Sequence, residues 1–76
     1  MSRLISTIAR EIAADWKNIN YAALPYLNAM YSLNDVNDTY GMDSAKSIVI
    51  YFLGNAQSWR GTVAKAIKAE LKAMIK

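Results

Sequence analysis

The chain has 76 residues, of which 54% are hydrophobic and 20% charged, and its formal net charge is +3. This length suits a single domain, 1–76, at the small end of what one hydrophobic core can stabilise, and the apolar fraction argues against general disorder. The sequence contains no cysteine and no histidine, which excludes disulfides and the usual zinc ligands, so we expect no metal and no other cofactor.

The first residues do not have the pattern of a signal peptide. Ser6, Thr7 and Arg10 interrupt the apolar residues there, so no continuous apolar stretch of the required length forms. We therefore expect a cytoplasmic protein.

Helical spacing of apolar residues predicts two amphipathic helices, over about residues 2–19 and 21–33. The apolar face of the first helix consists of Leu4, Ile5, Ile8, Ala9, Ile12, Trp16 and Ile19. Pro25 falls in the opening turn of the second helix, where its missing N–H costs little.

Residues 48–53 (IVIYFL) are six apolar residues in succession. Such a run also suits a strand, but no second segment of the chain alternates with period two, so a helix over about 44–56 is favoured. Asp43 or Ser44 would cap its start, and Gly54 or Asn55 would mark its end. A helix that is apolar in almost every direction belongs at the centre of the fold, and this one is too short to cross a membrane.

Residues 34–43 read as an acidic loop that contains Asp35, Asp38 and Asp43. The alternating oxygen-bearing residues from Asp35 suggest a calcium loop, but Tyr40 stands where glycine is needed and Lys46 where a bidentate glutamate is needed. The spacing therefore excludes this calcium motif.

A fourth helix is predicted over about 59–75, with Ser58 as its N-cap. One side of this helix is apolar, and a separate stripe carries Lys65, Lys68, Lys72 and Lys76. Four helices with short links predict an all-α, compact up-and-down bundle with the third helix central. In that bundle, Trp59 and Arg60 would meet the end of the first helix at Asp15 and Trp16.

Residues suited to catalysis are few. Glu11 and Asp15 are neighbours on one helix, but they border its polar face rather than a pocket that would separate their pKa values. Ser44, Ser47 and Ser58 are explained as residues at helix starts. We therefore expect a protein that is not an enzyme.

The tripeptide at 59–61 breaks the local rules for a helix start. Arg60 would face the positive end of the helix dipole, and Gly61 has low helix propensity. One interpretation is that Arg60 pairs with Asp15 while Gly61 allows close helix packing. The other is that Trp59 and Arg60 form a hot spot for a protein partner, and we assign Trp59, Arg60, Tyr26 and Asn28 to a partner-binding surface.

The lysine stripe offers an alternative site. Arg60, Lys65, Lys68, Lys72 and Lys76 would neutralise phosphates and bind nucleic acid without sequence preference, although a solvated face is the commoner role of such a stripe. A helix-turn-helix through the last two helices is disfavoured because Arg60 stands where that motif needs a buried apolar residue.

Several stretches resemble a group of short helical proteins encoded on bacterial phages, plasmids and integrated mobile elements. They are residues 15–18 (DWKN), 23–30 (ALPYLNAM), 40–47 (YGMDSAKS), 51–53 (YFL), 59–61 (WRG) and 68–71 (KAEL). The resemblance implies a setting among accessory factors that engage host machinery, including inhibitors of host defence nucleases, and no catalytic motif comes with it. We expect a small binding protein with an unidentified protein partner, no membrane association, and a monomeric or homodimeric state.

Overall fold

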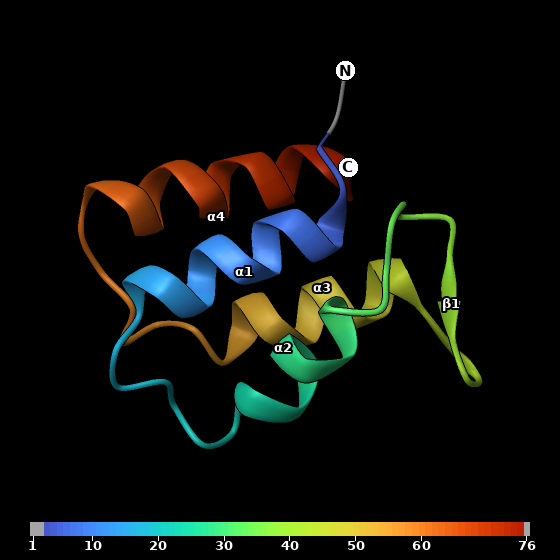
Figure 1. The fold of residues 1–76 in the computed structure, drawn as a ribbon, viewed down its shortest axis with the longest axis horizontal. Helices are drawn as coiled ribbons and strands as arrows, with labels where there is room; N and C mark the ends of the chain where they lie inside the picture. The colour runs from blue at the N-terminus through green and yellow to red at the C-terminus, as the bar shows by residue number, and fades with distance from the viewer. Residues whose placement is uncertain (1–2, 76) are drawn as a thin grey trace.

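Four α-helices make up most of the computed structural model, which describes residues 3–75 (Figure 1). They are α1 Ile5–Asp15, α2 Leu24–Met30, α3 Ala45–Gly54 and α4 Thr62–Met74. An antiparallel hairpin of β1 Thr39–Tyr40 and β2 Asp43–Ser44 lies between α2 and α3. All four predicted helices are confirmed, and each is shorter than its predicted range.

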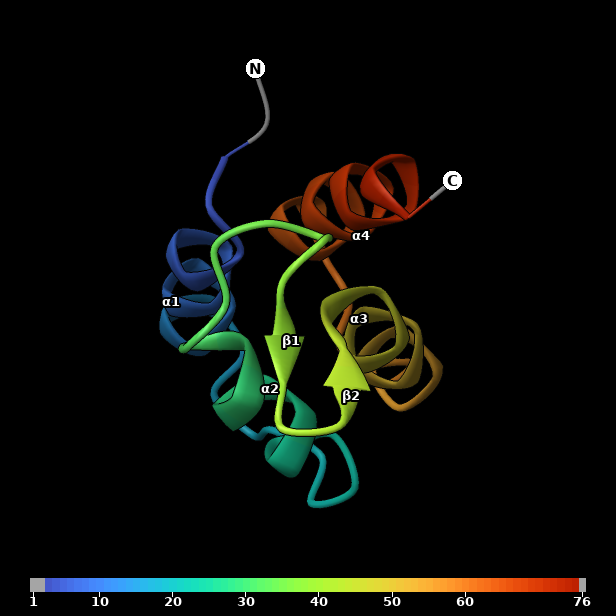
Figure 2. The same ribbon diagram turned by 90° about the vertical axis from the view of Figure 1, so that its right-hand side faces the viewer.

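The helices surround a common core. Figure 1 shows α4 antiparallel to α1, with α3 running in the same direction as α1. Seen along these three helices in Figure 2, α1, α4 and α3 enclose the core together with the short α2, and the hairpin lies near the viewer between α2 and α3. None of the helices within residues 3–75 is both long and apolar enough to cross a membrane.

The apolar face of α1 lies in this core, as its spacing predicts. Ile5, Ile8, Ala9 and Ile12 are fully buried, one or two on each turn of the helix. The first turn is capped by the main chain: the N–H groups of Ile5 and Ser6 donate to the carbonyls of Asn34 and Leu33 at 3.1 and 2.8 Å. These bonds attach the segment between α2 and β1 to α1.

The run at 48–53 is helical, but it does not lie at the centre of the fold. Ser44 caps α3 by accepting a hydrogen bond from the Ser47 N–H at 3.1 Å. Phe52 is fully buried, whereas Ile50 and Tyr51 are 46% and 55% exposed. The predicted central position is wrong because the other three helices cover only one side of α3, which leaves two of its large apolar side chains in solvent.

The segment 34–43 is more structured than the predicted loop, and the fold is therefore not strictly all-α. The Asp38 carboxylate accepts the N–H groups of Asn34 and Asp35 at 2.8 and 3.0 Å, and these bonds lower the pKa of Asp38. Gly41, with φ +62°, then reverses the chain so that Tyr40 pairs with Asp43. Strands of two residues are too short to produce a visible period-two pattern.

The start of the last helix differs from the prediction in a way that affects the candidate site. Ser58 is not the cap, because α4 begins at Thr62 after Gly61, whose φ is +116°. Trp59 and Arg60 therefore lie in the connection from α3 to α4. Arg60 immediately precedes the N-cap, Gly61, and is therefore not in the first helical turn, where the prediction placed it.

Candidate functional site

Trp59 is a core residue that joins the end of α1 to the start of α4. Its side chain is 2% exposed, and its indole ring stacks on Trp16 with centroids 5.7 Å apart and planes 14° apart. Its Nε1–H donates to Asp15 Oδ2 at 2.8 Å. The predicted contact of residues 59 and 60 with the end of α1 is thus confirmed for Trp59.

Lys68 completes this cluster, which we call the Trp59 joint (Asp15, Trp16, Trp59 and Lys68). The Lys68 ammonium donates to the Trp59 carbonyl at 2.6 Å and lies 5.8 Å from the centroid of the Trp59 ring. Burial lowers the pKa of Lys68, and the nearby charges of Lys72 and Arg60 lower it further. Lys68 therefore has a structural role that the predicted stripe of surface lysines did not include.

The joint changes the roles of the residues assigned to partner binding. Trp59 offers little surface to a partner, because it is 2% exposed and is stacked on Trp16. Arg60 is exposed and forms no ion pair with Asp15; the ion pairs found within residues 3–75 are those of Arg3 with Glu11 and Glu70.

An open cavity of about 290 Å³, which we call the basic groove, is lined by Trp59, Arg60, Gly61, Ala64, Lys65 and Lys68. Lys65 and Lys72 are exposed on the same helix, while Lys76 lies outside the described residues. The negative charge of Glu70 on this helix is compensated by Arg3, which donates to both of its carboxylate oxygens at 2.7 and 3.0 Å and lowers the pKa of Glu70. The pairing of Glu70 leaves Lys65 and Lys72 as exposed cations along α4.

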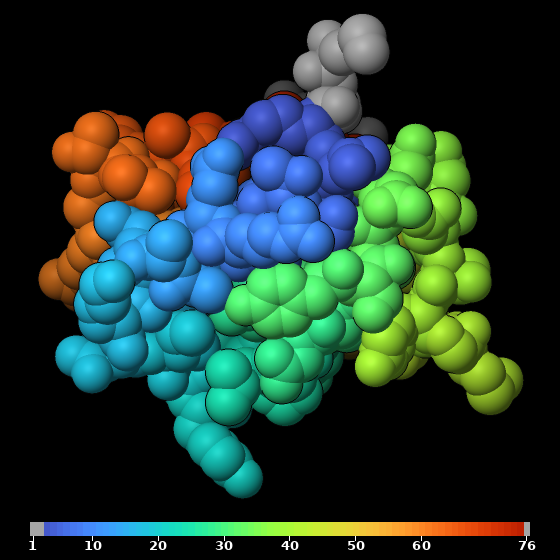
Figure 3. Space-filling view, viewed as in Figure 1, coloured from blue at the N-terminus to red at the C-terminus, as the bar shows by residue number. Residues whose placement is uncertain are grey.

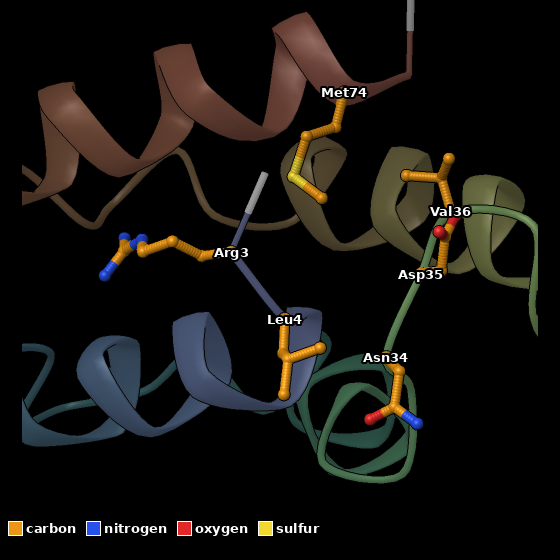
Figure 4. A pocket seen from close by; sticks show the side chains of 6 residues that line it. All are labelled: Arg3, Leu4, Asn34, Asp35, Val36 and Met74. Carbon is orange, nitrogen blue, oxygen red and sulfur yellow. The ribbon is translucent and has the colours of Figure 1, made fainter. Parts of the chain in front are cut away.

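A second cavity, of about 260 Å³, lies where the N-terminal segment meets α4 and the segment before the hairpin (Figure 4). Figure 4 shows Arg3 extending away from the other lining residues, between α1 and α4, where it forms its ion pairs. The rest of the lining, from Leu4, Val36 and Met74 with Asn34 and Asp35, offers no cluster of charges aimed at a ligand.

Three tyrosines from three different elements form a different surface. Tyr26 of α2 and Tyr51 of α3 are in contact, with ring centroids 5.5 Å apart and planes tilted by 33°. Tyr40 of β1 lines the same open cavity of about 450 Å³. We call this cavity the aromatic groove, and its lining includes Pro25, Tyr26, Tyr40, Asp43, Ile48 and Tyr51.

Other large apolar side chains are exposed on the elements that form the aromatic groove or beside them. The residues of this kind on or beside α2, the hairpin and α3 are Tyr21, Leu24, Tyr31, Met42 and Ile50. Figure 3 shows the turn of the hairpin, in yellow-green, projecting from the body of the molecule.

The structure separates the predicted site residues into these two surfaces. Tyr26 is half-buried in the aromatic groove, and Asn28 is exposed beside it, in a smaller hollow with Tyr21 and Leu24. Arg60 lines the basic groove. Trp59 lines the basic groove together with Arg60, whereas Tyr26 and Asn28 lie on the other surface.

Tyr40, Asp43 and Tyr51 are residues of the aromatic groove that were not predicted as site residues. The five-residue spacing of Tyr21, Tyr26 and Tyr31 argues against one line of stacked rings on α2, but it gives no information on tyrosines from other elements. The sequence feature that could have indicated this surface is Tyr40, a large aromatic residue in a mostly polar segment.

The described residues contain no group of three or more His, Cys, Asp or Glu side chains placed to hold a metal ion. No family model, curated protein or solved structure matches this chain.

Proposed function

We propose that this protein is a non-enzymatic binding protein that engages a protein partner through the aromatic groove. The observation that carries the proposal is the position of Tyr26, Tyr40 and Tyr51 around one open cavity, with Tyr40 47% exposed. Tyrosine supplies a large, rigid contact area and a polar hydroxyl, which is why it is enriched at binding hot spots.

Part of the lining of the aromatic groove is buried in the core of the protein. Ile48 and Ala29 also line the groove and are 3% and 6% exposed, so they are held in the core. Ser44 fixes the junction between the hairpin and α3 through its capping bond to Ser47. A surface whose backbone is already fixed loses little conformational entropy when a partner binds.

The proposed setting is the bacterial cytoplasm, with a protein of the host cell as partner and this chain acting as a monomer or homodimer. This part of the proposal rests on the resemblance to proteins of mobile elements.

Affinity capture from a bacterial lysate tests the proposal with a matched pair of variants. The double variant Tyr40→Ser/Tyr51→Ser removes two walls of the groove, whereas Tyr21→Ser removes a tyrosine that is 88% exposed outside it. We expect a protein that is captured by the wild type and by Tyr21→Ser and lost with the double variant, at equal thermal stability. Equal capture by all three proteins would contradict the proposal.

A second candidate function is binding of nucleic acid by the basic groove. It is favoured by the exposed Arg60 and Lys65 at the start of α4 and by the exposed Lys72 in its last turn. Random duplex DNA should then bind at low salt, with a log–log salt slope of magnitude up to about 3 for three phosphate contacts. Lys65→Glu should reduce this binding, whereas Lys46→Glu on α3 should not. Absence of binding at low salt would exclude this function.

A further inference from the structure

We infer that the aromatic groove binds an arginine side chain of the partner protein, with the guanidinium held against the tyrosine rings and the Asp43 carboxylate. This inference rests on the proposed function and specifies the chemistry of the partner. It follows from the charge of the groove, the nature of its walls and its size.

The charge of the groove comes from the exposed carboxylate of Asp43. Asp35 accepts the Asn37 N–H at 2.9 Å, and Asp38 accepts two N–H groups of the same turn. Asp43 lines the groove, is exposed, and accepts no side-chain hydrogen bond from residues 3–75. An acidic ligand would be repelled here, and an apolar one would desolvate a carboxylate without pairing it. The complementary ligand is a cation.

The walls of the groove favour the same ligand. The faces of tyrosine rings attract cations, and Tyr26 and Tyr51 form a paired wall while Tyr40 comes from the hairpin. A guanidinium is planar and weakly hydrated, so it stacks on rings and pairs with a carboxylate through two N–H groups. A lysine ammonium is a compact, strongly hydrated charge that lacks this planar match. The walls therefore favour arginine over lysine.

The size of the groove fits a side chain presented by a peptide segment. Its volume of about 450 Å³ lies in the range of small-ligand pockets, about 300–1,000 Å³. Met42, at the turn of the hairpin, is fully exposed and can pack against the apolar neighbours of the arginine, since its flexible thioether adapts to different surfaces.

The direct test uses capped Ala-Arg-Ala as the probe, titrated into the ¹⁵N-labelled full chain and followed by NMR. We expect saturable shifts of the Tyr40, Asp43 and Tyr51 amides. Capped Ala-Lys-Ala should bind several-fold more weakly, and capped Ala-Gln-Ala should give no saturable shifts. Equal binding of the glutamine peptide, or saturation elsewhere on the molecule, would overturn the inference.

Two variants separate the role of Asp43 from a general change in the hairpin. Asp43→Asn should weaken binding of the arginine peptide by about five- to tenfold, because the substitution removes the negative charge of the side chain and keeps its shape. Asp35→Asn, in the same acidic segment, should leave the affinity unchanged because its oxygen can still accept the Asn37 N–H. An unchanged affinity in Asp43→Asn, with the fold intact by circular dichroism, would refute the carboxylate's role.

Combined outcomes of these experiments distinguish a failure of the inference from a failure of the proposed function. If the captured partner is lost with Tyr40→Ser/Tyr51→Ser but retained by Asp43→Asn, and the arginine peptide does not bind, the groove binds a partner by other contacts and the inference alone fails. If the double variant retains the partner, the proposed function fails as well. Tighter binding of tetramethylammonium than of the arginine peptide would identify a quaternary-ammonium site and overturn the assignment to arginine.

Discussion

Two regions of this small protein hold most of its large aromatic side chains, and they use them in opposite ways. In the Trp59 joint, Trp16 and Trp59 are buried, stacked on each other, and the Trp59 N–H is bonded to Asp15. In the aromatic groove, Tyr40 and Tyr51 remain about half exposed beside the exposed carboxylate of Asp43. The comparison shows that the environment of an aromatic residue indicates whether it stabilises the fold or is available to a partner.

The largest expected effect of this difference is on stability. Trp59→Ala removes a buried ring and leaves Asp15 without its indole donor, so it should lower the free energy of unfolding by about 3–5 kcal/mol. Tyr51→Ala, at a half-exposed site, should cost no more than about 1.5 kcal/mol. Urea unfolding measures both values. Similar losses in the two variants would contradict the structural role of the joint.

The sequence predicted the four helices and the meeting of residue 59 with the end of α1, because apolar spacing and short connections determine both. It did not predict the exposure of Ile50 and Tyr51, since how much of a helix is covered depends on the length and placement of its neighbours. Trp59 was assigned to a partner site because a buried tryptophan and an interface tryptophan look alike in a sequence. The aromatic groove was missed because it is assembled from three separate elements.

A smaller effect is expected at the glycine that leads from the joint into α4. Gly61 has φ +116° and ψ −179°, a conformation nearly restricted to glycine, so Gly61→Ala should destabilise the fold by about 1–3 kcal/mol. Gly54 is the matched control: it is the last residue of α3, and an added Cβ would meet no atom within 4 Å. Thermal unfolding should show Gly54→Ala to be neutral or stabilising. Equal destabilisation by both substitutions would argue against a special backbone at the joint.

The smallest expected effect is the loss of stability at acidic pH. The pKa of Glu70 is lowered by Arg3 in the folded protein, so its contribution is present above the unfolded pKa, near 4.5, and is lost as the pH falls through the folded pKa. Asp38, whose pKa is lowered by two backbone N–H groups, acts in the same direction from its unfolded value of 3.8 downward. The melting temperature should therefore decrease as the pH is lowered below about 5. Glu70→Gln should reduce the slope of that decline, and an unchanged slope would show that the Arg3–Glu70 pair does not contribute.

The central claim is that the aromatic groove, and not the Trp59 joint or the basic groove, is the surface that binds the partner. Isothermal titration of the purified partner against two variants tests it most directly. Tyr40→Ser/Tyr51→Ser should weaken binding by more than about tenfold, whereas Arg60→Glu should change it by no more than about twofold. The opposite result, with the partner lost in Arg60→Glu and retained by the tyrosine variant, would contradict the account.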